Sequence, residues 1–502
     1  MLERRSIPIR PMKPATGGLG FFRFGKVGER VILTNDAGQW HTLTPDDFRA
    51  FVEGNMPPEH PQWAALTQKC FVRRPGDVVE TAERIRDRYG FLGRGPHLHV
   101  IVTTLRCNQG CGYCHASRLP MDRHDADMDV ATARTVVERV LDTPNPNIVI
   151  EFQGGEPTAA FDVIQASVEH ARAKKKPHQK IVFSLITNFT SMDEDKANWL
   201  IDNEVLVCTS LDGPEALHNA NRAWTGGGSA QASVLSWISW FNKAYIARGK
   251  DPDLWHVDAL MTTTRATLSQ WKAVVDLYVG LGIRTIHFRP LNPYGFAEKS
   301  WNKIGYTMDE FLETYAKVLD YVIALNRDGI SIQEGTAATF LQKLLTPHDP
   351  NYVDIRSPCG AGTGQVAWMH DGSVYPCDEA RMLAATGDST FRLGDVNEMS
   401  MADVLMHPTV KSMALASTLD SLPMCSDCWA KPFCGVCPIH TWRNEKDLFG
   451  QRPKSSMCHR FYKTLEMLVE RMDHDPDGST LRVFHRWTLR REQVQHPEDA
   501  CA

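Results

Sequence analysis

A regular alternation of apolar runs and helical patterns between residues 98 and 330 constrains the fold more than any other feature of this 502-residue chain. Most of the apolar runs are continuous and rich in Val, Ile, Phe and Thr, which is typical of parallel strands covered on both faces. Six such strands are expected, at residues 98–105, 147–153, 181–188, 206–211, 256–264 and 285–291. Helices are expected between them, at residues 130–141, 161–174, 193–203, 230–247 and 268–281. These repeats predict an α/β fold, a partial (β/α)6 barrel with its functional groups at the carboxyl ends of the strands.

Polar residues and glycines recur where the expected strands end. Three cysteines, Cys107, Cys111 and Cys114, follow the first strand. The second strand leads into Gly154, Gly155, Glu156 and Pro157. The next two strands end on Thr187, Asn188, Ser210 and Asp212. Because the carboxyl ends of parallel strands meet at one edge of a barrel, we expect these groups to line one site.

The early cysteines have the spacing Cys-x3-Cys-x2-Cys, with Tyr113 directly before the last thiol. Three thiolates could hold a zinc ion, although zinc normally needs a fourth ligand. They could also hold three irons of a [4Fe–4S] cluster, which leaves the fourth iron open to bind and reduce a substrate. The spacing by itself leaves both alternatives open.

Residues 345–465 lose the alternation and become rich in loops and cysteines. Seven cysteines fall here: Cys359, Cys377, Cys425, Cys428, Cys434, Cys437 and Cys458. A stretch with little core of its own is expected to be held together by metal, either as iron–sulfur clusters or as a pair of zinc knuckles. The remaining cysteines are expected to be buried small side chains or incidental thiols; they are Cys70, Cys208 and Cys501.

The two ends of the chain are expected to form separate parts. Residues 1–95 predict a small α+β module, with strands at 21–24 and 31–34 and a helix that Thr44 caps and Pro45 begins. Two strands followed by short helices are compatible with a small winged-helix-like element, and equally with a lid or packing extension. Residues 466–502 are strongly charged and predict a solvated terminal helix with a frayed end.

Charge and hydropathy argue against two classes of partner. The formal net charge is −5 and no basic face is evident, so no nucleic acid is expected to bind. The N-terminus leads into no apolar signal segment, and no run approaches the roughly 18 apolar residues of a membrane-spanning helix. We therefore expect a cytoplasmic protein with no membrane partner.

Between about residues 98 and 460 the chain resembles the radical S-adenosylmethionine (SAM) enzymes that carry a C-terminal SPASM extension. The early cysteine loop and the Gly154–Pro157 turn carry the first part of the resemblance, and the later cysteines carry the second. It implies a TIM-like radical SAM barrel at residues 96–330 and a SPASM domain at 345–465. In that family a [4Fe–4S] cluster reductively cleaves SAM to a 5′-deoxyadenosyl radical, which abstracts hydrogen from the substrate.

The resemblance also implies roles for the strand ends. The SAM-binding cluster would be held by Cys107, Cys111 and Cys114. The SAM amino group would be met by Gly154, Gly155 and the Glu156 carboxylate, which would accept from the ammonium. The adenine would pack beside Tyr113. The ribose or carboxylate would be held by Ser184, Thr187 and Asn188, and the next strand end would be lined by Ser210 and Asp212.

The SPASM resemblance implies two auxiliary [4Fe–4S] clusters. The outer cluster would be surrounded by Cys425, Cys428, Cys434 and Cys458, and the inner cluster would take three ligands from Cys359, Cys377 and Cys437. Two departures stand out. The spacing before Cys437 is x2 where the family commonly has x3, and no cysteine between Cys208 and Cys359 offers a fourth inner thiolate. That place is left to another ligand or to the substrate.

Asp378 directly follows one of these cysteines. In related sulfatase maturases an aspartate at this point acts on the substrate as a base. The resemblance therefore implies an acid/base role for Asp378. A supporting contact beside the cluster is the alternative.

Longer phrases resemble the B-type maturases of the His-Xaa-Ser peptide system, at residues 210–222, 288–297, 305–311 and 378–383. The resemblance implies a radical SAM oxidoreductase that modifies a small ribosomally synthesised precursor peptide. A second radical SAM maturase and an electron donor such as ferredoxin or flavodoxin are the implied partners. The alternatives are a sulfatase-maturase-like oxidation of a protein Cys or Ser, and a non-catalytic Fe–S partner of a paired maturase.

Overall fold

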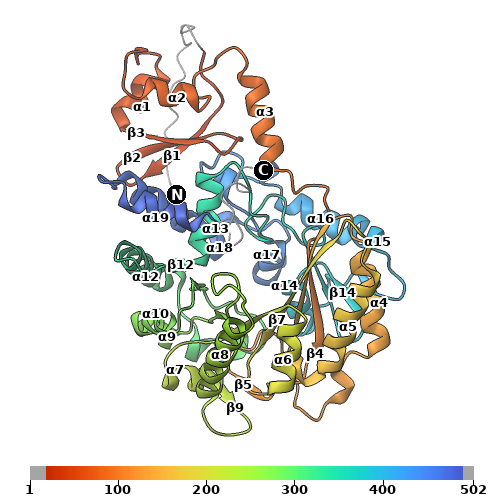
Figure 1. Ribbon diagram of the computed structural model, residues 1–502. Coiled ribbons are helices and arrows are strands. Elements are labelled where there is room, and N and C mark those ends of the chain that lie inside the picture. The colour runs from red at the N-terminus through yellow and green to blue at the C-terminus, as the bar shows by residue number, and fades with distance from the viewer. Residues whose placement is uncertain (1–17, 490–502) are drawn as a thin grey trace.

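The computed structural model describes residues 18–489, and its centre is an eight-stranded sheet with the order β10-β8-β7-β6-β4-β13-β14-β15 (Figure 1). The strands from β10 to β13 run parallel, and β14 and β15 add to them antiparallel. The bounds are β4 Leu98–Thr104, β6 Asn147–Gly154, β7 Lys180–Thr187, β8 Val205–Ser210, β10 Asp258–Leu260, β13 Gln365–Trp368, β14 Ser373–Tyr375 and β15 Gly394–Asp395. The α/β fold with a parallel central sheet is confirmed.

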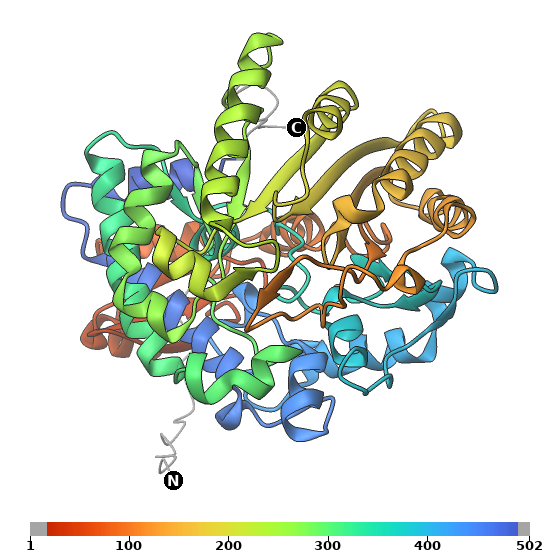
Figure 2. The ribbon, with the colours of Figure 1, turned by 90° about the horizontal axis from the view of Figure 1, so that it is seen from below.

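Helices cover the outer face of the parallel strands, while the C-terminal segments lie on the other side (Figure 2). Their bounds are α4 Val130–Leu141, α5 Phe161–Lys174, α6 Glu194–Asp202, α7 Glu215–Asn221, α8 Ala230–Ala247, α9 Arg265–Ser269, α10 Trp271–Gly280, α11 Phe296–Ile304 and α12 Met308–Arg327. Short polar side chains cap several of the helices: Asp129 accepts from the third residue of α4, and Asp193 and Ser229 do the same for α6 and α8.

β6 shows how the sheet separates the core from the site. Ile148, Ile150 and Phe152 are buried in the main core, beneath the outer helices. Because side chains alternate along a strand, Glu151 and Gln153 lie on the opposite face. The inner face of the barrel can therefore carry polar groups without weakening the core.

The prediction of a sixth strand at residues 285–291 is wrong for most of that range. Only β11 (Thr285–Ile286) is a strand, and it pairs with β12 (Gln333–Glu334) outside the main sheet. Pro290 and Pro293 cannot donate backbone hydrogen bonds, so the following segment cannot sustain a ladder. It continues instead as an irregular loop that reaches the cysteine loop.

The cysteine-rich region continues the central sheet, which the sequence did not indicate. β13 pairs parallel with β4, with Gln365 opposite Leu98. The remainder consists of turns, short 3-10 helices and the helices α13 Gly335–Leu345, α14 Asp378–Ala384, α15 Met401–Met406, α16 Pro408–Ser417, α17 Pro438–Glu445 and α18 Ser456–Asp473. The two cysteine-bearing regions thus share one sheet.

The expected terminal helix is present, but the prediction that it is solvated is wrong. α19 (Ser479–Trp487) buries Val483, Phe484 and Trp487 and packs against α12 and α13. Its apolar side chains recur at helical spacing, so one face faces the core and the charges occupy the other. The expected frayed end, with Cys501, lies outside the described residues.

The N-terminal module has one more strand than expected. It contains β1 Arg23–Val27, β2 Arg30–Thr34 and β3 Trp40–Leu43 in an antiparallel sheet, followed by α1 Pro45–Val52, α2 Trp63–Gln68 and α3 Asp77–Arg88. The module contacts the C-terminal half directly, because Thr34 Oγ1 donates to the Trp429 carbonyl at 2.7 Å and Trp40 Nε1 donates to the Leu344 carbonyl at 2.9 Å.

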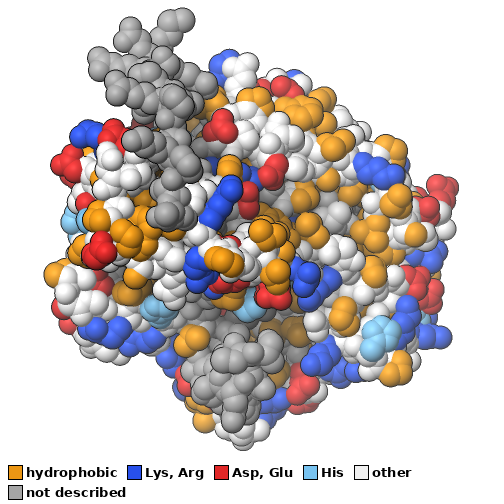
Figure 3. Space-filling model, turned by 90° about the horizontal axis from the view of Figure 1, so that it is seen from above, with side chains coloured by type: hydrophobic (Ala, Val, Ile, Leu, Met, Phe, Trp, Pro, Cys, Tyr) orange, Lys and Arg blue, Asp and Glu red, His pale blue; other side chains and the backbone are white. Residues whose placement is uncertain are grey.

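The surface of the module is mixed in character. Seen from above, acidic and basic side chains are interspersed among apolar ones (Figure 3). Within residues 18–489, no helix has both the length and the apolar character needed to cross a membrane.

Candidate functional site

The three early cysteines lie in a loop that distant segments hold in place. After β4 the chain forms β5 (Gln109–Cys111), which pairs antiparallel with β9 (Arg222–Trp224). The backbone N–H of Phe296 donates to the Cys114 carbonyl at 2.9 Å. Protein contacts therefore fix the path of this loop.

The thiols of this loop face one another. Burial raises the pKa of Cys107 most, and the charges of Cys111 and Cys114 raise it further. Burial likewise raises the pKa of Cys111 to about 12, and Cys114 adds to the effect. A cationic cluster would offset this cost, because a thiol binds metal as the thiolate. The donor set fits a cluster bound by three thiolates.

The spacing of the sulfur atoms separates zinc from a cluster. Around tetrahedral zinc, sulfur atoms about 2.3 Å from the ion lie about 3.8 Å apart. Within residues 18–489, only Cys70, Asp77 and Glu80 bring three candidate ligand atoms within 4.8 Å of one another. Among the described residues, neither the early nor the late cysteines bring three sulfur atoms within 4.8 Å of one another, so they do not form a preformed zinc tetrahedron.

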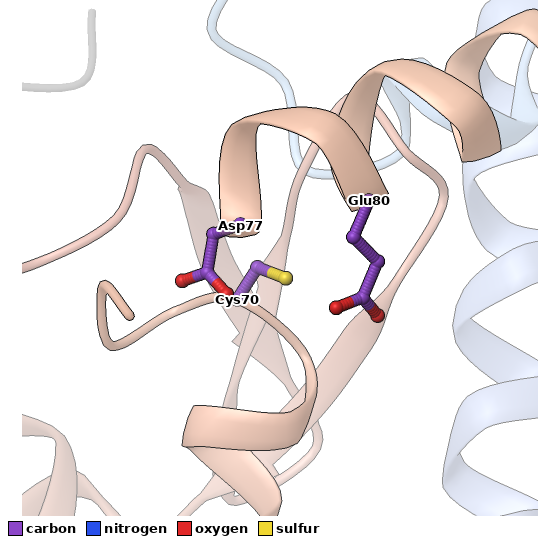
Figure 4. A group of neighbouring side chains, drawn as sticks. All are labelled: Cys70, Asp77 and Glu80. Carbon is purple, nitrogen blue, oxygen red and sulfur yellow. The ribbon is translucent and has the colours of Figure 1, made fainter. Parts of the chain in front are cut away.

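The tight group in the N-terminal module has another explanation (Figure 4). The Arg74 guanidinium forms ion pairs with Asp77 at 2.8 Å and with Glu80 at 2.9 Å. The positive charge between the carboxylates is thus already supplied by the protein. Cys70 is buried, as expected for a small apolar side chain.

The turn after β6 is attached to the cysteine loop by its backbone. Gly155 N donates to the Thr104 carbonyl at 2.8 Å, and Glu156 N donates to the Arg106 carbonyl at 2.7 Å. A Cβ on Gly154 would lie 2.2 Å from the Thr104 oxygen, and one on Gly155 would lie 2.3 Å from the Arg106 oxygen. The glycines are therefore required for the close approach of two protein segments.

The Glu156 carboxylate is enclosed by donors from its own chain. It is fully buried and accepts hydrogen bonds from Thr158, from Thr187 Oγ1 at 2.7 Å and from Asn188 N at 2.8 Å. Burial raises its pKa, and these donors oppose the rise. A carboxylate enclosed in this way supports the turn, and its expected direct contact with the SAM ammonium remains a prediction.

The other expected SAM contacts occupy different depths of the barrel. Asn188 lies closest to the loop, because its amide donates to Cys107 Sγ at 3.6 Å and to Asn108 Oδ1 at 3.2 Å. Ser210 lies at the end of β8. Ser184 lies further back along β7, where it lines an inner cavity with Glu151. The direct contacts of these residues with SAM remain predictions.

Tyr113 and Asp212 form a buried pair beneath the loop. The Tyr113 hydroxyl donates to Asp212, and Thr262 N donates to the same carboxylate at 3.1 Å. Arg222 Nε lies 3.2 Å from Asp212, and its guanidinium lies 5.3 Å from the centre of the Tyr113 ring. Burial raises the pKa of Tyr113. The expected packing of Tyr113 on adenine remains a prediction, beside this observed supporting contact.

The outer cysteines of the C-terminal region surround a common space. Burial raises the pKa of Cys434 most, and the charges of the other three thiols raise it further. Burial raises the pKa of Cys425 to about 11, with further contributions from Cys458 and Cys428. Four converging thiols fit the outer cluster implied by the sequence.

The inner cysteines are brought together as well. Cys359, Cys377 and Cys437 are buried in one packed cluster with Tyr294. Burial raises the pKa of Cys377, and the charges of Cys437 and Cys359 add to it. Despite its shorter spacing, Cys437 therefore lies with the other two.

Asp378 begins α14 and is held by an arginine. Arg381 Nε donates to Asp378 at 2.6 Å, and the same guanidinium donates to Gln153 Oε1 at 2.9 Å. Gln153 in turn donates to Glu151 Oε1 at 2.6 Å. This chain of polar contacts joins the SPASM region to the inner face of β6.

Sequence reasoning missed the arginines that organise the site. Arg106 binds Asp127 through both carboxylate oxygens at 2.7 Å and donates to the Ala159 carbonyl at 2.8 Å. Arg222 is enclosed beneath the loop. Its position at the start of β9 gives no local signal, because its partner Asp212 lies on another strand end.

Comparison with known proteins agrees with this geometry. Residues 101–251 match the family model of the radical SAM superfamily, and residues 359–429 match that of an iron-sulfur cluster-binding domain, SPASM. A cysteine-type anaerobic sulfatase-maturating enzyme of Clostridium perfringens is 27% identical over 310 residues, which cover 59% of this chain and 76% of the relative.

Two solved structures share the fold. Native anSMEcpe with bound AdoMet and Kp18Cys peptide gives a TM-score of 0.64 at 21% identity, covering 78% of this chain and 100% of the other. Streptococcus suis SuiB bound to the precursor peptide SuiA gives 0.53 at 15% identity, covering 87% and 98%.

A part-barrel with three thiolates at its strand ends, joined to a second cysteine-rich sheet extension, defines a class of iron–sulfur enzyme. The chain has a radical SAM domain followed by a SPASM domain, and it is an enzyme that uses [4Fe–4S] clusters and S-adenosylmethionine.

Proposed function

We propose that this enzyme modifies a ribosomally synthesised peptide by abstracting a hydrogen atom from it. The observation that carries the proposal is a cavity between the barrel and the SPASM region, lined by Arg289, Asp354, Glu379 and Cys437. It brings strand-end groups of the barrel beside the inner cysteine group. A peptide substrate is supported by the bound peptides named for anSMEcpe and SuiB.

Three cysteine groups are the proposed cluster ligands, with the memberships given above. When bound, the cluster at Cys107, Cys111 and Cys114 supplies the electron that cleaves SAM and so generates the 5′-deoxyadenosyl radical. Asn188 would hold the Cys107 sulfur in place through its amide. The backbone of Gly154 and Gly155 would meet the SAM amino group, while Glu156 keeps their turn rigid. Ser184 and Ser210 are proposed to contact the remainder of SAM.

Asp378 is the proposed acid/base group toward the peptide. Arg381 holds its carboxylate through a hydrogen bond and connects it to Gln153 on β6. A charge-assisted hydrogen bond of this kind orients a carboxylate, which a proton transfer needs. A purely supporting role is the alternative, and the Asp378 variant described below distinguishes them.

The finer proposal is maturation of a His-Xaa-Ser-type peptide in the cytoplasm. The sequence phrases at 210–222, 288–297 and 378–383 support it. A paired radical SAM maturase and a low-potential donor such as ferredoxin or flavodoxin are the proposed partners. The N-terminal module is the proposed peptide-recognition element.

The test is co-expression with a candidate small peptide, followed by tandem mass spectrometry with and without this enzyme. Anaerobically reconstituted enzyme should contain about twelve irons and convert SAM to 5′-deoxyadenosine in the presence of a reductant. A defined mass change on the peptide, absent without the enzyme, is expected. Zinc without iron or sulfide would contradict the proposal.

A second candidate is oxidation of a protein Cys or Ser, which the similarity to the Clostridium perfringens sulfatase-maturating enzyme favours. Mass analysis would then find a loss of hydrogen or sulfur at one Cys or Ser of a protein partner. A non-catalytic role predicts that a Cys107/Cys111/Cys114 triple alanine variant still supports modification.

A further inference from the structure

The inner cysteine group has three thiolates where a closed cubane needs four ligands. Cys359, Cys377 and Cys437 pack together, and the described cysteines outside the three groups lie elsewhere, Cys70 in the N-terminal module and Cys208 on β8. The fourth place therefore falls to a group other than a thiol.

Two carboxylates lie at this place. Asp354 and Glu379 both line the cavity that Cys437 borders. Glu379 lies on the first turn of α14, two residues after Cys377, so the same helix start presents both side chains.

Glu379 faces all three thiols. Burial raises the pKa of Cys377 most, and the charge of Glu379 makes the next largest contribution. It also raises the pKa of Cys437 and that of Cys359, which reaches about 12. Asp354 contributes at Cys359 and Cys437. A fourth cubane ligand must lie close to the other three, and Glu379 lies two residues after Cys377 and lines the cavity that Cys437 borders.

The Glu379 carboxylate is also without a partner. No other side chain among residues 18–489 donates a hydrogen bond to it or forms an ion pair with it, whereas its neighbour Asp378 is paired with Arg381. Asp354 Oδ1 likewise has no hydrogen-bond partner within the described residues, and the Arg289 guanidinium lines the same cavity as both carboxylates. Burying a carboxylate without a direct partner is costly, and a bound cation offsets that cost.

We propose that the Glu379 carboxylate is the fourth ligand of the inner auxiliary cluster, which then has three thiolates and one carboxylate. The inference rests on the proposed assignment of Cys359, Cys377 and Cys437 to that cluster. It makes the inner cluster fully ligated, so this cluster transfers electrons and does not bind the peptide. Carboxylate ligation also sets its potential above that of an all-thiolate cluster, since replacing thiolate ligands raises the potential.

The test uses the full chain with Cys107, Cys111 and Cys114 changed to Ala, which removes the SAM cluster and its open iron. This protein should hold about eight irons in two clusters. Electron paramagnetic resonance after mild oxidation should show no three-iron signal, because both clusters are closed. Adding Glu379→Ala opens one iron, so oxidation should release it and produce a three-iron signal approaching one per chain.

Three further variants decide the identity of the ligand. Glu379→Cys should suppress the three-iron signal and lower the midpoint potential, as a fourth thiolate would. Asp354→Asn and Asp378→Asn, the neighbouring carboxylates, should leave spectrum and potential unchanged. The inference is overturned if the parent protein already shows the three-iron signal, or if Asp354→Asn produces it and Glu379→Ala does not. About four irons in the parent protein would instead contradict the cysteine assignment itself.

Discussion

The early cysteine loop and the outer cysteine segment hold the same kind of ligand in different ways. The early loop is bounded by β4, paired through β5 with β9, and tied to the Gly154–Gly155 turn by backbone hydrogen bonds. The outer segment consists of turns and one 3-10 helix, Lys431–Phe433. Its backbone–backbone hydrogen bonds join near neighbours, such as Cys428 N to the Cys425 carbonyl at 3.1 Å. Its long-range hydrogen bonds come from side chains, such as Thr34 Oγ1 to the Trp429 carbonyl.

The comparison shows what holds each of the two segments in its conformation. The early loop has its shape from the protein, which suits a site that must orient SAM with one iron left open. The outer segment is held from a distance by side chains, such as Thr34 on Trp429 and Arg88 on Pro432, but within residues 18–489 its backbone pairs with no distant strand. A fully ligated cluster can supply the backbone order that this pairing gives the early loop. Removing metal should therefore affect the two regions unequally.

The largest expected effect comes from the early loop. Cys107→Ala should abolish 5′-deoxyadenosine formation and remove about four irons, because one cluster loses a ligand. Hydrogen exchange of residues 98–114 should change little, since protein contacts hold the loop. Cys428→Ala is the matched variant: hydrogen exchange at residues 424–437 should rise clearly. An equal rise in hydrogen exchange in both segments would contradict the proposed difference between them.

The next effect tests the contact between the SPASM region and the barrel. Asp378→Asn should slow peptide modification by about 10²–10⁴-fold, the usual contribution of a general acid or base. SAM cleavage without peptide should persist, because the SAM site is untouched. Asp371→Asn, an exposed carboxylate on the preceding hairpin, is the control. A supporting role for Asp378 predicts parallel losses in both reactions.

A glycine pair tests the rigidity of the early loop. Gly155→Ala should destabilise the enzyme by about 3 kcal/mol, because its Cβ meets backbone oxygens that cannot rotate away. Gly112→Ala should cost little, since no atom lies within 4 Å of the added carbon. Anaerobic urea unfolding measures both. Similar midpoints for the two variants would show that the turn can shift.

The smallest expected effect concerns the carboxylate beneath the turn. Glu156→Gln should cost about 1–2 kcal/mol, because an amide nitrogen would face donors that now bind an oxygen. Glu313→Gln, on the exposed face of α12 and paired only with Lys317, should cost about 0.3 kcal/mol. The loss of SAM affinity in Glu156→Gln should follow the loss of stability. Lost affinity at unchanged stability would support a direct SAM contact.

The sequence predicted the outer helices well because their signals are local. Helical spacing at 130–141 and the capping Asp129 lie within one segment, and α4 has those bounds. Strand pairing is not local. The parallel pairing of β13 with β4 depends on residues far apart in the chain, so the common sheet could not be read from either segment. The prolines at 290 and 293 did signal that the sixth strand would fail.

The site divides in the same way. The cysteine spacing was sufficient to predict which thiols gather, and the structure brings Cys359, Cys377 and Cys437 together despite the unusual interval. The surroundings of each side chain were not predictable. Glu156 was expected at the cofactor, yet donors from the third strand end enclose it. Arg222 had no assigned role, yet it completes the buried pair of Tyr113 and Asp212.

The sequence by itself determined the class of chemistry, because thiolate spacing and the periodicity of strands and helices are properties of short segments. Only the tertiary structure decided what each polar side chain faces, because hydrogen bonds and ion pairs join strand ends that are distant in the chain. That physical difference assigns Glu156 to support the early loop. It also leaves Glu379, unlike its neighbour Asp378, without a side-chain hydrogen bond or ion pair among residues 18–489, in the cavity that Cys437 lines.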